Sequence, residues 1–128
     1  MITLSTLKDA TAQQVFDQVV THMIKQGERS IRHGSKMCLY RGDKGLMCAA
    51  GCLIADDEYQ PQFDNGAGNG GGTWDRLVSN QTVPEHHQNL IVALQRAHDR
   101  SGLIERVLVK MKEVGVTYEL NLDAFNAS

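Results

Sequence analysis

The chain has 128 residues, of which 41% are hydrophobic and 22% charged, and its formal net charge is −2. These values are typical of one globular domain and exclude the strongly basic surface of a general nucleic-acid binder. The apolar stretches are too short to span a membrane, and the first residues lack the pattern of a signal peptide. Three cysteines make no disulfide framework, which favours a reducing, cytoplasmic setting. We therefore expect one cytoplasmic domain over residues 1–128, without a membrane partner.

The first predicted element is a helix over about residues 12–26. Thr11 and Gln14 have the spacing of a capping box, in which each side chain bonds the backbone of the other residue. Apolar residues then recur at steps of three and four, as on one face of a helix. Gly27 suits a left-handed cap at the end of this helix.

A β-hairpin is predicted over about residues 36–50. Two short apolar segments flank the sequence R-G-D-K-G at positions 41–45, which is typical of a turn. The register depends on the turn length, and we favour the registers that place Cys38 and Cys48 on one face. Because a lone hairpin is only marginally stable, we expect a further strand from the alternating tail at 116–123 or from residues 2–5.

The next stretch, residues 64–73, contains five glycines in ten positions. This composition predicts a flexible loop, and its context matches neither a P-loop nor a dinucleotide-binding fingerprint. Trp74 follows directly, and its side chain is either an anchor for a partner or part of the core.

Two further helices are predicted over about residues 84–98 and 102–114, with Pro84 in the first turn of one and Gly115 as the cap of the other. The pair His98-Asp99 resembles a dipeptide of metal phosphohydrolases, but the upstream histidines that those enzymes need cannot be assigned. We therefore expect His98 to be a boundary residue that holds a backbone carbonyl. Together the elements predict an α+β fold, in which a small antiparallel sheet packs against three helices.

All three cysteines, Cys38, Cys48 and Cys52, lie among small and apolar neighbours. Free cysteine in such company behaves as a small hydrophobe, so we predict that the three thiols fill the core and that no cofactor is bound. A zinc site that adds His33 or His22 is an alternative, although the spacing departs from that of structural zinc ligands. A catalytic nucleophile at Cys52 is a second alternative, but no histidine has a sequence spacing that would identify it as the base for Cys52.

Charge is unevenly distributed along the chain. Residues 25–44 carry a net charge of +4, and residues 56–75 carry a net charge of −5. These segments are either two solvated faces that attract each other or a polar binding surface. For a binding surface, the candidate partner-binding residues are Arg29, Arg32, Lys36, Arg41, Lys44, Asp56, Asp57 and Trp74.

The stretch CLYRGDKGLMCAAGCLIADDEY resembles a family of small phage, prophage and bacterial proteins. That family carries a C-x-Y-R turn, then G-x-x-C-A-x-G-C-L-I, then an acidic segment that ends in tyrosine. The matching positions are Cys38, Tyr40, Arg41, Gly45, Cys48, Ala49, Gly51, Cys52, Leu53, Ile54 and Tyr59. The motifs H-x-x-x-Q-G at 22–27 and L-Q-x-x-H-D at 94–99 are also similar. The resemblance implies a genomic setting and no mechanism.

From these features we expect a small intracellular binding protein without enzymatic activity. With the resemblance, its partner is expected to be a bacterial host protein, which it inhibits or regulates by protein–protein contact. The alternative is a metalloprotein or a cysteine-dependent enzyme that uses Cys38, Cys48 and Cys52 with a histidine. The near-neutral charge argues against a nucleic-acid partner. Methionine-containing apolar stripes on two of the predicted helices leave room for a homodimer.

Overall fold

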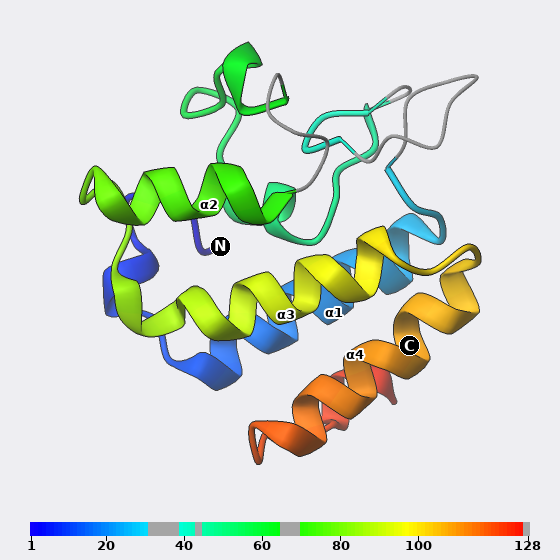
Figure 1. Ribbon diagram of the computed structural model, residues 1–128. Coiled ribbons are helices and arrows are strands. Elements are labelled where there is room, and N and C mark those ends of the chain that lie inside the picture. The colour runs from blue at the N-terminus through cyan, green and yellow to red at the C-terminus, as the bar shows by residue number, and fades with distance from the viewer. Residues whose placement is uncertain (31–38, 43–44, 65–69, 127–128) are drawn as a thin grey trace.

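The structure is a computed structural model that describes residues 1–30, 39–42, 45–64 and 70–126, with only the backbone described at 70–73. These residues form four α-helices and contain no strand (Figure 1). The helices are α1 (Ala12–Gln26), α2 (Gly70–Ser79), α3 (Gln88–Asp99) and α4 (Ile104–Thr117). The predicted α+β fold is therefore wrong, because no sheet exists in the described part of the chain.

The helix α3 lies at the centre of the molecule. It packs against α1, α2 and α4, and Figure 1 shows it between α2 and α4 with α1 behind it. Three single turns of 3-10 helix border this arrangement: η1 (Leu7–Asp9), η3 (Ala50–Leu53) and η5 (Glu85–His87). The turn η3 contacts both α1 and α3, so residues around Cys52 complete the core between these helices.

The helix α1 forms as its sequence predicts. Thr11 and Gln14 make the reciprocal capping box, and Gly27 ends the helix with a φ of 71°. The methionines of the apolar stripes are used inside the chain, since Met23 on α1 and Met111 on α4 are both fully buried. No helix in the described ranges has both the length and the hydropathy that crossing a bilayer requires.

The end of α4 corrects two predictions. Gly115 lies inside the helix, where a Cβ atom would come within 2.7 Å of Cζ of Phe16, so glycine allows close packing against α1. The helix ends in a Schellman motif, in which Glu119 has a φ of 58° and the Leu120 amide bonds the Gly115 carbonyl at 2.8 Å. The expected strand at 116–123 is thus wrong, because the chain turns back here and enters the short turn η6 (Asp123–Phe125).

The other predicted helix over 84–98 is present as η5 followed by α3, after Pro84. The N-terminal residues 2–5 form no strand either, and Leu4 and Leu7 are buried in the core. Residues 65–69 of the expected glycine-rich loop lie outside the described residues, and α2 begins at Gly70. The sequence analysis missed α2 because its first turn consists of glycines, which disfavour a helix.

The predicted hairpin over 36–50 is also wrong for the residues that the structure describes. Leu39–Gly42 and Gly45–Ala49 contain no strand, and the chain then enters η3. Consecutive residues from Cys48 to Ile54 are all buried, whereas a strand of a one-sided sheet alternates between a buried and an exposed face. Gly51 allows tight packing, because a Cβ atom at this position would lie 2.6 Å from the Tyr40 carbonyl oxygen.

Candidate functional site

In the described part of the chain no strand lies beside the segment around Met47 and Cys52, so side chains bond its backbone groups. Gln26 of α1 accepts from the Met47 amide at 2.8 Å and donates to the Met47 carbonyl at 2.8 Å. His22, one helical turn earlier, also contacts this carbonyl through Nε2 at 3.0 Å. Gln18, a further turn back, donates to the Cys52 carbonyl at 3.1 Å. These three side chains of α1 take the place of a β-ladder.

The side chain of Arg41 also bonds backbone carbonyls near Cys52. Its guanidinium donates to the carbonyl oxygens of Gly51 and Ile54 at 3.0 and 2.7 Å and lies 4.9 Å from the ring centroid of Tyr59. The side chain is 18% exposed, while that of Asp56, its ion-pair partner at 3.4 Å, is 100% exposed. Arg41, a candidate partner-binding residue, is therefore turned inward and holds the fold.

Asp64 closes the same region from the end of the turn η4 (Pro61–Asp64). Its carboxylate accepts from the amides of Tyr40 and Arg41 at 2.7 and 3.3 Å, and from the hydroxyl of Tyr59. Burial and the hydrogen bond to Asp64 raise the pKa of Tyr59 to about 12. Tyr59 thus stays a neutral donor over the physiological range.

The described cysteines are core residues, as predicted. Cys48 and Cys52 are buried free thiols; the Gly51 amide donates to Cys48 at 3.3 Å, and Cys52 donates to the Ala49 carbonyl at 3.1 Å. Burial raises the pKa of Cys52 to about 12 and that of Cys48 well above its ordinary value. Neither thiol is the reactive thiolate that nucleophilic attack requires.

The zinc alternative is tested only in part. Cys38 and His33 lie outside the described residues. Within the ranges that the structure describes, no group of three histidine, cysteine, aspartate or glutamate side chains is placed to hold a metal ion.

His98 is fully buried and differs from the expected boundary histidine. Its Nε2 accepts from the Ser30 amide at 3.0 Å, so the ring proton is on Nδ1, which bonds Oδ1 of Asp99 at 2.9 Å. Both ring nitrogens are therefore occupied by internal bonds. The role expected for His98 is filled instead by His22 and by His87, whose Nε2 lies 2.9 Å from the Ala10 carbonyl oxygen.

The remaining candidate partner-binding residues lie in different places. Arg29 donates to the carbonyl oxygens of His98 and Asp99 at 3.2 and 3.3 Å, so it closes the C-terminal end of α3. Asp56 and Asp57 are exposed, and Trp74 is only 1% exposed and belongs to the core. Arg32, Lys36 and Lys44 lie outside the described residues. The structure does not bring these candidates together at one surface.

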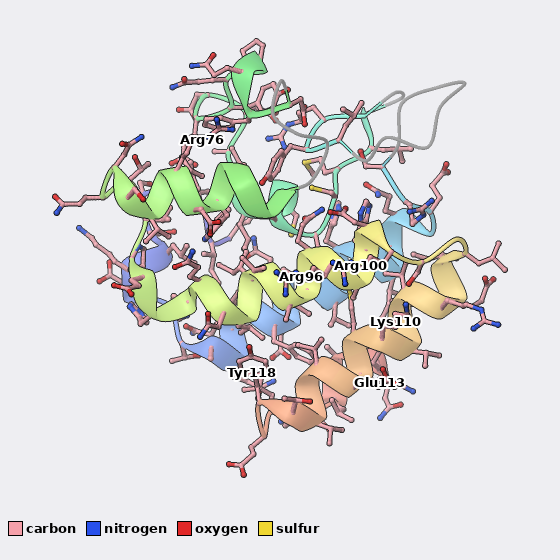
Figure 2. The ribbon with its side chains drawn as sticks, viewed as in Figure 1. Arg76, Arg96, Arg100, Lys110, Glu113 and Tyr118 are labelled. Atoms are coloured by element: carbon pink, nitrogen blue, oxygen red, sulfur yellow. The ribbon has the colours of Figure 1, made fainter. Side chains whose placement is uncertain are left out.

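A groove between α3 and α4 is the surface feature that stands out. It has a volume of about 420 Å³, and small apolar side chains lie along it, namely Ala93 and Ala97 of α3 and Val114 of α4. Its polar lining residues are Arg96, Arg100, Lys110, Glu113, Thr117 and Tyr118, and Figure 2 labels all of them except Thr117. All six are exposed.

The three cations of the α3–α4 groove have no internal partner in the described part of the chain. In that part of the chain Arg96, Arg100 and Lys110 form no ion pair, whereas Arg41 pairs with Asp56. The sequence analysis missed this site because it weighed charge along the chain, and the three cations lie outside both charged segments. The spacing of Arg96 and Arg100, four residues apart beside an apolar stripe, was the available signal.

Two other hollows are lined mostly by residues that already bond the fold. One of about 610 Å³ lies beside Glu58, which accepts from the amides of Leu4, Ser5 and Ala55 at 2.9–3.0 Å. The other, of about 740 Å³, runs along α1 and includes Gln18, His22 and Gln26. The α3–α4 groove differs from both because its rim has an excess of positive charge, with three cations against the one carboxylate of Glu113.

Comparison with known proteins gives no match for this chain, whether to a protein-family model, to a curated protein or to a solved structure. The phage setting that the resemblance implied, and the inhibitory role that we expected in that setting, therefore have no support from these comparisons. Function has to be inferred from the arrangement of the described side chains.

Proposed function

We propose that this chain is a non-enzymatic binding domain of the reducing cytoplasm that contacts a bacterial protein through the α3–α4 groove. One observation carries the proposal: Arg96, Arg100 and Lys110 surround small apolar side chains and have no internal ion-pair partner in the described residues. Arginine beside apolar surface is typical of protein interfaces. Three unpaired cations in one groove favour an external partner.

The internal use of the reactive side chains supports a binding role over an enzymatic one. An enzyme needs a nucleophile or a base that reaches its substrate. Cys48, Cys52 and His98 are all buried and bonded within the fold. The described thiols therefore do not favour a cysteine-dependent enzyme or a zinc protein.

The position of the groove also supports the proposal. The helix α3 packs against three other helices, so it is held firmly, and α4 is fixed to α1 through the close contact of Gly115 with Phe16. A surface built on packed helices is already formed before the partner arrives, which lowers the entropy lost on binding.

The test compares two matched arginines. Arg96 and Arg76 each lie in the last turn of a helix, α3 and α2 respectively, and both are exposed. Only Arg96 lines the groove, and Figure 2 shows Arg76 on the far side of α3. Arg96→Gln and Arg76→Gln therefore remove the same charge from the same helical position, and only the first is expected to weaken partner binding.

The measurement is affinity capture from a bacterial lysate, quantified by mass spectrometry for the wild-type chain, the two single variants and Arg96→Gln/Arg100→Gln. The proposal expects proteins that the wild type and Arg76→Gln capture equally and the groove variants lose. Circular dichroism melting curves establish that all variants are folded. Capture that is unchanged in the double variant would refute the role of the groove.

A further inference from the structure

We propose that the α3–α4 groove takes an acidic amphipathic helix of the partner protein. This inference rests on the proposed function and adds the chemistry of the occupant. Its basis is the combination of three unpaired cations with a row of small apolar side chains between two helices.

The positive charge of the groove favours an acidic partner helix. The rim carries Arg96, Arg100 and Lys110 against the single carboxylate of Glu113, although the whole chain has a net charge of −2. Arginine binds a carboxylate through two parallel hydrogen bonds, and such charge-assisted bonds are about twice as strong as neutral ones. The groove is thus a local positive site on a weakly acidic protein.

The spacing of the arginines favours a helix over an extended peptide. Arg100 is the C-cap residue of α3 and follows Arg96 by four positions, so the two lie about one turn apart at the end of this helix, about 6 Å along its axis by the helical rise. Carboxylates four residues apart on a partner helix have the same separation. The described residues also offer no strand whose edge an extended peptide could join.

The apolar part of the groove suits the other half of an amphipathic helix. Ala93 and Ala97 are one turn apart on α3, and Val114 faces them from α4. Small side chains leave room for larger apolar residues of the occupant to pack between the helices. Tyr118, which is 38% exposed and follows the end of α4, adds an aromatic contact at one end of the groove.

A nucleic acid is another polyanion that such cations could bind. The test must therefore distinguish nucleic-acid binding from binding of an acidic helix. An extended nucleic-acid backbone would need a longer basic track, whereas here the cations are few and the lining is partly apolar. The acidic helix uses both features of the groove.

The experiment measures binding of four dye-labelled probes to the full chain by fluorescence anisotropy. The first probe is a 16-residue helical peptide with glutamates four residues apart on one face and leucines on the other. The second has the same composition in scrambled order, the third replaces glutamate with lysine, and the fourth is a 16-nucleotide single-stranded DNA. Each is titrated at low and at raised salt.

We expect the first peptide to bind more tightly than the other three, and more weakly at raised salt. Arg96→Gln/Arg100→Gln should weaken this binding about tenfold or more, since two interfacial charge pairs are lost. Arg76→Gln should change it by less than about twofold, because a distant surface charge contributes little. These three results together support the acidic helix.

Equal or tighter binding of the scrambled peptide or of the DNA would overturn the inference, as would equal losses in the groove variant and Arg76→Gln. The two proposals can also fail separately. If lysate capture depends on the groove but no acidic peptide binds, the acidic-helix inference is refuted and the binding function stands. If capture does not depend on the groove, the proposed function itself is refuted.

Discussion

The backbone amide of Ala50 donates a hydrogen bond of 2.7 Å to Oε1 of Gln95, which lies 45 positions later in the chain. Both residues are buried, and Nε2 of Gln95 in turn donates to Oδ1 of Asp99 at 2.6 Å. Asp99 also bonds His98, whose other ring nitrogen accepts from Ser30. One buried chain of polar bonds thus joins α3 to the segments on either side of it.

The first prediction concerns this bond. Gln95→Leu leaves the buried Ala50 amide without its acceptor, so we expect the free energy of unfolding to fall by about 1–3 kcal/mol. Asn89→Leu, at an exposed position of the same helix, should stay within about 0.5 kcal/mol of the wild type. Urea denaturation measures both variants, and equal stability of the two would contradict the structural role of Gln95.

The second prediction concerns Gly51. A Cβ atom there would lie 2.6 Å from the Tyr40 carbonyl oxygen and 3.3 Å from Sγ of Cys48, so Gly51→Ala forces the buried backbone apart. We expect a loss of about 1–3 kcal/mol, as for other overpacked sites. Gly102→Ala is the matched control, because its Cβ meets nothing within 4 Å. Thermal melting should rank the wild type above Gly51→Ala but not clearly above Gly102→Ala.

The third prediction concerns the thiols. Because burial raises the pKa of Cys48 and Cys52, both should react slowly with a disulfide reagent at neutral pH in the native protein. The measurement uses Cys38→Ser, so that only the two described thiols are counted. In denaturant, both thiols should become accessible to the reagent together. A single thiol that reacts fast under native conditions would show that the core at Cys48 and Cys52 is open.

The fourth prediction concerns pH. Burial lowers the pKa of His22, although its bond to the Met47 carbonyl partly opposes this, so the folded state favours the neutral ring. The unfolded chain then binds the proton more readily, and stability is lost as the pH falls below about 6.5, the ordinary value for histidine. His22→Gln keeps a donor for Met47 and should therefore lose less stability between pH 7 and pH 5.

Denaturation at several pH values measures this difference. The stability of His22→Gln should still fall somewhat between pH 7 and pH 5, because burial also lowers the pKa of His87. Parallel slopes for His22→Gln and the wild type would exclude His22 as a source of the pH dependence.

Local patterns were enough to predict three of the four helices. The capping box of Thr11 and Gln14 lies within four residues, and an apolar stripe needs only its own helix to be recognised. The burial of Cys48 and Cys52 also followed from their immediate neighbours. Interactions between residues close in the sequence explain these successes.

Only the tertiary structure decided how residues 39–42 and 45–54 fold. The segment resembles a hairpin by local pattern, but its amides and carbonyls are bonded by Gln26 and Gln95, which lie 21 and 45 positions away from their partners. In the same way, Gly115 continues a helix because the ring of Phe16 packs against it.

The α3–α4 groove likewise arises only when two helices come together, since Arg96 belongs to α3 and Lys110 to α4. The sequence by itself determined where most of the described helices begin and that Cys48 and Cys52 are buried, because those features depend on local spacing. The tertiary structure decided which polar side chains are consumed within the fold and which remain at the surface, because that depends on long-range contacts.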